Sequence, residues 1–482
     1  MIAPKKMRMK KLRRLPVAAL AAVLLAGCAV GPDYQRPAQA LPAQYPAGAD
    51  AAGAAAAEVP VQWWTLYGQP ELDRLVAQAL ERNRDIEQAV ARVEQADALA
   101  RQAGAALLPR VDLNASGGRA RVSPLTLPPN GGTGNQYQLG LSASFEIDFW
   151  GRLRRTREAA RAQLLSSTYA RDTINLSVAA LTAQAWFGLR ALDEQIALTS
   201  STLQTREEGL RLLNLRQEKG TGSQLDVEQA EGLRSASAVL LRDLRRQRSV
   251  LQTQLAVLTG QLDLSLPEAP LASLPLPPQP PAGLPAALLE RRPDVRSAEQ
   301  LLAAASARIG AARAEQFPAV SLTGSFGFES AELGDLLKSP SRIWSIGAGL
   351  AQPLFDGGRL AARTDQAVAT HREAQGAYRG VVEDAFKDVA DALANLQAAK
   401  GSQEDLARAD RAAANALKLA RARYDVGYSG HLDLLDAQRS AAAAQLDLVR
   451  NRQAQLAASV DLFRALGGGW QAPGQDTAAA PR

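Results

Sequence analysis

Four short segments of the chain alternate between apolar and polar residues with a period of two. The clearest covers residues 136–149 and a second covers residues 344–351, while residues 110–116 and 320–328 alternate more weakly. The apolar positions of the two clear segments are Tyr137, Leu139, Leu141, Ala143, Phe145, Ile147, Phe149, Trp344, Ile346, Ala348 and Leu350. Alternation over about ten residues is the pattern of a transmembrane β-strand, although soluble amphipathic hairpins show it too.

Four strands are too few to close a membrane barrel, because single-chain barrels begin at about eight strands. Open strand edges are also not tolerated in lipid, where no water satisfies the backbone groups. If these segments lie in a membrane, several copies of the chain must therefore combine.

Between the alternating segments, the pattern predicts unusually long helices. Helices of moderate length are expected over residues 69–107 and 286–315, and proline-free stretches rich in good helix formers cover residues 151–218 and 358–425. After a glycine-containing turn, a last helix runs to about residue 260 or 466. A helix of about 68 residues would extend ~100 Å, which predicts coiled-coil packing or a helical barrel.

The same order of elements occurs twice, with an offset of about 208 residues. The matching blocks are residues 80–85 with 289–294, 109–113 with 318–322, 150–153 with 357–360, and 220 and 225–227 with 427 and 432–434. The chain is therefore interpreted as a signal peptide (1–27), an N-terminal segment (28–68), a first repeat (69–260), a proline-rich linker (261–286), a second repeat (287–466) and a flexible tail (467–482).

The first 28 residues indicate export and lipid attachment. Seven basic residues fall within residues 1–14, and the apolar run of residues 15–26 is too short to span a bilayer. The run ends in LAGC, which resembles a bacterial lipobox with Cys28 as the lipidated residue. A secreted protein with a chance cysteine is the alternative. Ala29, rather than the Asp that retains lipoproteins at the inner membrane, favours the outer membrane.

Composition argues against several other functions. The net charge of +6 comes from the basic start, since the remaining chain has 48 basic and 49 acidic residues. With few aromatic residues, this leaves no indication of nucleic-acid binding. A single cysteine and two isolated histidines, His371 and His431, predict no metal site, and we expect His431 to be a solvated polar residue. The glycine-rich runs at 131–134 and 356–359 lack the Lys-Ser/Thr of a phosphate loop, so neither an enzyme nor a cofactor is expected.

Several motifs lie along nearly the whole chain after residue 27. They are CAVGPDY at 28–34, WW at 63–64 with PEL at 70–72, FDGGR at 355–359, YDVG at 424–427, LDLLDAQ at 432–438 and ALGGGW at 465–470. Together these resemble an outer-membrane efflux channel of the TolC type, in the lipoprotein (NodT-like) branch that serves resistance-nodulation-division pumps.

The resemblance implies an α+β membrane protein that assembles as a homotrimer. Four strands per chain would give one 12-stranded barrel in the outer membrane, continued by a periplasmic α-helical barrel. The implied partners are a periplasmic adaptor protein, an inner-membrane resistance-nodulation-division transporter and outer-membrane lipid. We also expect the Trp63–Trp64 pair to pack the N-terminal segment against the base of the barrel.

The resemblance also implies roles for residues at the far ends of the long helices. Asp433 and Asp436 are three residues apart at a predicted helix start, so their carboxylates share one face. By similarity they line the closed periplasmic aperture, where six carboxylates of a trimer would repel anions and bind cations. The alternative is that these acids only complement the dipole of the helix N-terminus.

By similarity, Asp226 and Tyr424 latch neighbouring helices at this aperture. Ser223 and Asp226 also fit a capping box, and the basic residue that family members often carry after the second glycine is absent. Gly220 and Gly427 are expected to form turns. The resemblance adds that the segments Arg216–Gly220 and Arg423–Gly427, which include Val426, are the tips that contact the adaptor.

Two classes of function remain open on the sequence. One is a passive outer-membrane channel for drugs or other small molecules, and the other is a lipid-anchored coiled-coil scaffold without a pore. Within the channel class, type I protein secretion is an alternative to pump-coupled efflux. The lipobox and the terminal glycine-rich motif favour efflux.

Overall fold

The computed structural model describes residues 29–46, 59–121, 123, 132–271, 274–276 and 287–471. They form two compact units. Unit 1 holds the described parts of residues 1–37, 94–166 and 298–378, and unit 2 holds those of residues 38–93, 167–297 and 379–482. Each unit thus combines residues of both repeats. The predicted signal peptide and Cys28 lie outside the described residues.

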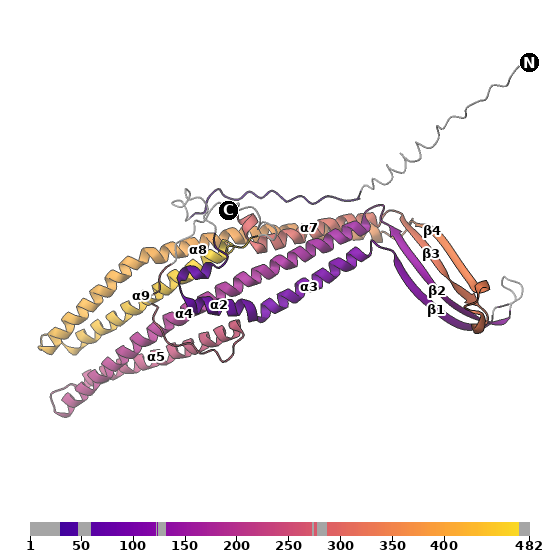
Figure 1. Cartoon of the computed structure of the whole chain (residues 1–482). Helices are drawn as coiled ribbons and strands as arrows, with labels where there is room; N and C mark the ends of the chain where they lie inside the picture. Colours follow the sequence, from indigo (N-terminus) through magenta and orange to yellow (C-terminus); the bar gives the residue numbers. More distant parts are fainter. Residues whose placement is uncertain are drawn as a thin grey trace, which may run out of the picture. The chain divides into compact units, whose positions relative to one another are not determined.

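Unit 1 contains an antiparallel sheet in the order β1-β2-β3-β4 (Figure 1). The strands are β1 (Arg110–Arg121), β2 (Thr133–Ile147), β3 (Ala319–Ser330) and β4 (Arg342–Ala351). The two strands of the first repeat therefore pair with the two of the second, through β2 and β3. In the described sheet β1 and β4 are the edge strands.

The pairing places the alternating residues on two distinct faces. Leu141 lies opposite Leu113 in β1 and Phe326 in β3, while Phe326 lies opposite Trp344 in β4. This apolar face is exposed, and 72% of the Trp344 surface is accessible. The other face carries hydroxyl and amide groups, with hydrogen bonds from Asn114 to Ser142 and between Ser325 and Ser345, each 2.8 Å long. Phe149 was predicted on the apolar face but lies beyond the end of β2, against the ring of Trp150.

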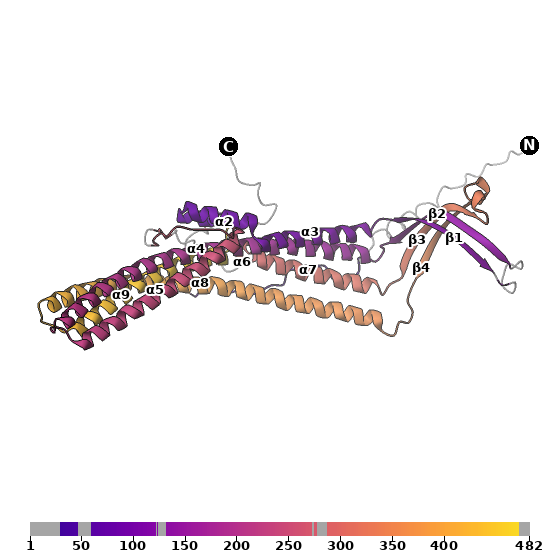
Figure 2. The ribbon, with the colours of Figure 1, turned by 90° about the horizontal axis from the view of Figure 1, so that it is seen from below.

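The helices follow the predicted order. They are α2 (Pro70–Arg82), α3 (Arg84–Ala105), α4 (Arg152–Glu218), α5 (Gln224–Thr259), α6 (Leu288–Arg291), α7 (Pro293–Ala314), α8 (Arg359–Asp425) and α9 (His431–Ala465). In unit 2, α4 with α5 and α8 with α9 form two helical hairpins (Figure 2). No helix among the described residues combines the length and apolar character that a membrane-spanning helix needs.

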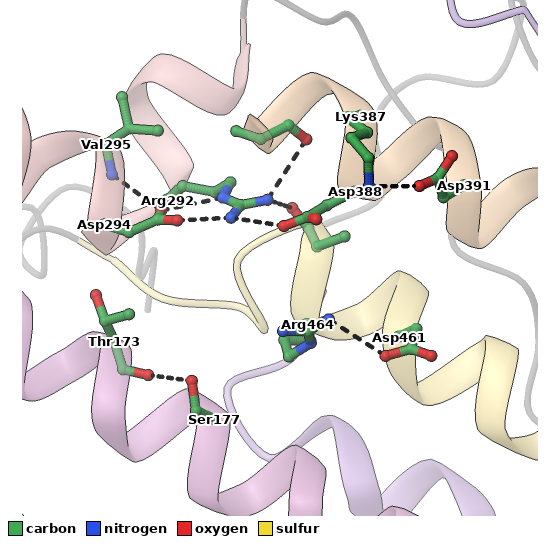
Figure 3. A network of polar contacts seen from close by, with 12 residues as sticks. Thr173, Ser177, Arg292, Asp294, Val295, Lys387, Asp388, Asp391, Asp461 and Arg464 are labelled. Carbon is green, nitrogen blue, oxygen red and sulfur yellow. Dashed lines mark hydrogen bonds and ion pairs between the residues drawn. The ribbon is translucent and has the colours of Figure 1, made fainter. Parts of the chain in front are cut away.

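The two helices predicted as continuous, at 69–107 and 286–315, are each broken at equivalent positions. Asn83 is extended, and its side chain caps α3 by accepting a hydrogen bond from the Asp85 N–H group. In the second repeat Arg292 precedes Pro293, which disfavours a helical conformation of Arg292. The buried guanidinium of Arg292 binds Asp294 at 2.6 Å and Asp388 at 3.0 Å (Figure 3).

The core of unit 2 forms around aromatic residues that precede α2. Trp63 is fully buried in the short 3-10 helix η2 (Trp63–Tyr67) and stacks on Phe463 of α9, with ring centroids 5.4 Å apart. Tyr67 packs on Phe187 of α4 at 4.8 Å. The Trp63–Trp64 pair therefore packs among helices of unit 2. Its packing against the base of the barrel stays a prediction.

The described part of the linker is fixed to the same core. Its leucines Leu264, Leu266, Leu271 and Leu274 are buried. Asp193 of α4 is also buried and binds both Arg190 at 2.9 Å and Arg248 at 2.6 Å. These two arginines donate to the backbone carbonyls of Pro267 and Leu266. The first half of the proline-rich segment is therefore a packed strap rather than a loose spacer.

In unit 1, the N-terminal segment is held against the end of the sheet. The Val30 N–H group donates to the Trp150 carbonyl at 3.0 Å, just after β2. Gly31 lies so close to Gly310 of α7 that an added Cβ would be 2.4 Å from the Gly310 Cα. Arg36 then forms a bidentate ion pair with the buried carboxylate of Glu299.

Candidate functional site

The two helical hairpins of unit 2 end in turns with the same backbone geometry. After α4, the Gly220 N–H donates to the Gln217 carbonyl and the Thr221 N–H to the Arg216 carbonyl, both at 2.9 Å. After α8, the Gly427 N–H donates to Tyr424 and the Tyr428 N–H to Arg423, at 3.0 and 2.8 Å. Each pair of bonds is a Schellman motif, which satisfies carbonyls left free at a helix end.

Both motifs require glycine at the turn. Gly220 has a φ of +72° and Gly427 a φ of +81°, a region that residues with a Cβ rarely adopt. Apart from the adjacent residues of the chain, no described atom lies within 4 Å of the position a Cβ would take at either glycine. The backbone conformation, rather than lack of space, therefore selects glycine.

A small polar cluster links the two hairpins near these turns. The Arg216 guanidinium at the end of α4 donates to the Tyr424 hydroxyl at 3.1 Å, and it also lies 5.8 Å from the centre of the Tyr424 ring. The other side of the cluster is His431, whose ring centroid is 5.3 Å from that of Tyr424. Asp226 at the start of α5 acts electrostatically on His431. The structure thus brings together three predicted residues, Arg216, Asp226 and Tyr424.

The environment of His431 differs from the one predicted from the sequence. It was predicted to be solvated, but both ring nitrogens are buried and neither has a hydrogen-bond partner among the described residues. His431 begins α9 and lies three and four positions before the buried Leu434 and Leu435. That spacing places all three on one helix face, and it was the sequence signal for a packed imidazole.

Asp433 and Asp436 lie on the other side of α9. Both are exposed, whereas Leu434 and Leu435 between them are buried. Asp436 forms an exposed ion pair with Arg439 at 2.6 Å. The predicted common face of the two carboxylates is therefore present, and Asp433 faces solvent without an ion pair among the described residues.

Asp226 follows a capped helix start. The Ser223 hydroxyl accepts a hydrogen bond from the Leu225 N–H at 3.2 Å, so Ser223 is the N-cap of α5. In a capping box the hydroxyl would instead accept from the N–H of Asp226. The capping interaction in the structure therefore involves Leu225.

A cavity of about 290 Å³ lies between the two hairpins beside this cluster. Its wall is apolar and polar in about equal parts, with leucines of α4, α5 and α9 beside Tyr424 and His431. Four charged side chains also line it: Arg206, Glu208, Arg421 and Asp425. The remaining predicted tip residues, Arg423 and Val426, are exposed at the turn after α8.

The chain is similar to known channel proteins over nearly its whole length. The sequence profile of the family described as "Outer membrane efflux protein" matches residues 75–261 and 284–468. Outer membrane protein OprJ of Pseudomonas aeruginosa is 37% identical over 458 residues, covering 94% of this chain and 95% of OprJ. The toluene efflux pump outer membrane protein TtgF of Pseudomonas putida is 37% identical and covers 93% and 95% of the two chains. The solved structure of the outer-membrane channel OprN superposes with a TM-score of 0.86 at 30% identity, covering 92% of this chain and all of that one.

A four-stranded sheet combined with helices of 67 residues in a two-fold repeat defines a TolC-like channel protein, a class whose members are trimers with four strands per chain and a long helical barrel. The relatives are efflux channel proteins rather than enzymes. This chain belongs to the outer membrane efflux protein family. It is the outer-membrane channel component of an efflux system, and its predicted fold class and class of function are confirmed.

Proposed function

We propose that the two hairpin ends form the periplasmic entrance of a passive duct, closed at rest by Asp433 and Asp436. The observation that carries this proposal is the exposure of both carboxylates on the side of α9 opposite the buried Leu434 and Leu435. In a trimer these residues would supply six carboxylates around one axis. Such a ring binds cations and repels anions.

The two acids contribute unequally. The Asp436 carboxylate shares its charge with Arg439 at 2.6 Å, although this exposed pair is screened by water. Asp433 has no such partner among the described residues. We therefore assign the greater part of the negative potential at the aperture to Asp433.

A latch between the hairpins accompanies this ring. The family's basic residue after the second glycine is absent, but Arg216 reaches Tyr424 from the opposite hairpin. We assign Arg216, Tyr424 and Asp226 to the latch. Arg216 thus supplies the cation from a different place in the sequence.

The glycine-capped ends, residues 216–220 and 423–427, are assigned to adaptor contact. Val426 and Tyr428 expose 67% and 81% of their surface there, which provides apolar contact area at an accessible turn. The periplasmic adaptor would bind these ends, and a resistance-nodulation-division transporter in the inner membrane would deliver the cargo. We further propose that Cys28 carries the lipid anchor in the outer membrane.

The cargo is proposed to be drugs or other small molecules. TtgF is named for toluene efflux and is similar over 93% of this chain, which supports small cargo. Membership of the efflux family favours this function over protein secretion and over a scaffold without a pore.

The aperture is tested by single-channel recording in planar bilayers. We expect the double substitution Asp433→Ala with Asp436→Ala to raise conductance and to reduce block by multivalent cations. The matched control is Asp447→Ala, which removes an exposed carboxylate further along α9 that also pairs with an arginine three residues on. Unchanged conductance and unchanged cation block in the double variant would contradict the aperture assignment.

A further inference from the structure

The His431 imidazole packs on Tyr424 of its own hairpin and lines the cavity between the two hairpins. Its Nδ1 and Nε2 atoms are both buried, and neither has a hydrogen-bond partner among the described residues. A neutral imidazole has one N–H donor and one acceptor nitrogen, whereas a protonated imidazole has two donors and a positive charge. Protonation in this place would add a buried donor without an acceptor, which is unfavourable.

The surroundings of His431 reinforce this preference for the neutral form. His431 is the first residue of α9, and a positive charge at a helix N-terminus opposes the helix dipole. Burial lowers the pKa of His431, the carboxylate of Asp226 partly opposes that effect, and Arg216 lowers the pKa further. On its own hairpin, the hydroxyl of Tyr424 accepts a hydrogen bond from Arg216 at 3.1 Å and forms none with His431.

The charged groups that line the cavity beside the imidazole divide evenly in sign. Arg206 and Glu208 of α4 and Arg421 and Asp425 of α8 line the same cavity. On α9 itself, Asp433 and Asp436 are exposed on the side away from the buried leucines. Asp226 is thus the carboxylate that favours the charged imidazole, while Arg216 and the helix N-terminus oppose it.

We propose that His431 is a proton-sensitive lock between the two hairpins. The neutral ring packs on Tyr424 and holds α8 and α9 against α4 and α5, whereas the protonated ring leaves its buried position for water and releases them. The inference rests on the proposed aperture, and it adds a condition under which the aperture loosens: acidification of the periplasmic side.

The pH dependence of the lock follows from the pKa of the His431 ring in its packed and released positions. An imidazole in water has a pKa near 6.5, and the pKa in the packed position is lower. The packed arrangement is therefore fully favoured above about pH 6.5 and loses stability as the pH falls below that value. The equilibrium between packed and released hairpins shifts by up to about tenfold for each pH unit of difference between the two pKa values.

Two measurements that do not depend on conduction test the lock in the full-length trimer. The first is NMR titration of Cε1-labelled histidine, which is assignable because the chain has only two histidines, with His371→Gln to identify the signals. We expect a pKa for His431 below 6.5. The second is the spin-label distance between Thr221→Cys and Tyr428→Cys, at the ends of the two hairpins. We expect this distance to increase between pH 7.5 and pH 5.5.

Conductance over the same pH range then links the lock to the pore. Wild-type conductance should rise on acidification, and His431→Phe, which keeps an aromatic ring without a titrating group, should abolish both the rise and the distance change. His371→Phe is the matched control and should keep both. Asp226→Asn removes the favourable carboxylate, so it should move the midpoint to lower pH.

The outcomes separate this inference from the proposed function. A distance change that persists in His431→Phe, or a His431 pKa at or above 6.5, overturns the lock. A distance change that requires His431, in trimers that do not conduct at either pH, supports the lock and overturns the proposed duct. A wild-type pore that conducts with neither a distance change nor a conductance change overturns the lock alone.

Discussion

Gly220 and Gly427 show how a single residue defines the end of a 67-residue helix. Both have positive φ angles in Schellman motifs, and both have open space around the missing Cβ. Forcing an L-residue into this conformation costs roughly 1–2 kcal/mol, while Asn tolerates it better because its side chain bonds locally. Substitutions here therefore separate backbone strain from the chemistry of the side chain.

Gly427→Glu should abolish efflux while trimers and export remain intact, because a charged side chain would project from the proposed adaptor contact. Gly427→Ala should lower the free energy of unfolding of the hairpin by about 1 kcal/mol, and Gly427→Asn by less. Drug-resistance assays and thermal unfolding measure the two effects. Normal resistance with Gly427→Glu, at wild-type protein levels, would contradict the tip assignment.

Among single residues, those with a regular spacing in the sequence could be predicted. The turn glycines and the exposed pair Asp433 and Asp436 lie where spacing places them. The partner of Tyr424 could not be predicted, because Arg216 is 208 positions away and reaches it only through hairpin packing. The burial of His431 was readable from its spacing to two leucines, but a lone histidine beside a turn is ordinarily solvated.

The internal repeat predicts how the edge strands β1 and β4 pair. Within the described sheet β1 and β4 are edges, and an edge in lipid must pair. Because the class is trimeric, we expect β4 to pair with β1 of a neighbouring chain. The pairing of β2 with β3 joins two repeats, as a contact between β4 and β1 of different chains would. The register of the first pairing therefore predicts that of the second.

The register of the β4–β1 contact follows when each residue of the β2–β3 pair is replaced by its counterpart in the other repeat. Ser142 of β2 lies opposite Ser325 of β3. The counterpart of Ser142 is Gly349, because Asp112 lies opposite Ser142 and its counterpart Ser321 lies opposite Gly349. Ser325 corresponds to Ser116. Gly349 of one chain should therefore lie opposite Ser116 of the next, with polar residues on a common face.

Oxidation of the double variant Ser116→Cys with Gly349→Cys should produce covalent dimers and trimers, seen by denaturing electrophoresis. Directly opposite residues of antiparallel strands have Cα atoms about 4.5 to 5.5 Å apart, which lies within the range of disulfides. The matched control pairs Ser116→Cys with Gly347→Cys, two residues out of register. A Cβ at Gly347 or Gly349 meets a hydroxyl oxygen at 3.0 or 3.1 Å, so the local cost is similar. Stronger cross-linking in the control would show a register shifted by two residues.

The helices and strands could be predicted because the helical stretches are long and free of proline and the strands alternate with a period of two. The breaks at Asn83 and Arg292 were not predicted, although Pro293 and the capping Asn83 are local signals for them. Distant groups add to both, namely the Leu258 carbonyl for Asn83 and Asp388 for Arg292. For residues 261–286 the sequence predicted only a proline-rich linker. Its buried leucines and its contacts with Arg190 and Arg248 arise only when α4 and α5 are packed.

For the whole molecule, sequence repeats and compact units are different divisions. The repeats are consecutive in the chain, whereas each compact unit takes segments from both. Long helices that contribute residues to both units account for this, because α4 and α8 each cross from one unit to the other in sequence. A repeat expressed alone would lack half of the β2–β3 pairing and half of the aromatic core.

Assembly can be measured on the intact protein by gel migration. Unboiled samples should migrate as a trimer and boiled samples as a monomer, because paired strands resist detergent until heated. Cys28→Ser should lose the mass of the acyl groups by mass spectrometry and keep the heat-dependent shift, since strand pairing rather than the lipid closes the barrel. A Cys28→Ser protein that migrates as a monomer before boiling would contradict this order of contributions.

The hydrogen bond from the Val30 N–H group to the Trp150 carbonyl limits how far the proposed lipid anchor can lie from the end of β2. Cys28 is two residues before Val30, and two extended residues span at most about 7 Å. The acyl chains would therefore enter the bilayer close to the end of β2. The proposed anchor would then also limit the height at which the strands lie in the membrane.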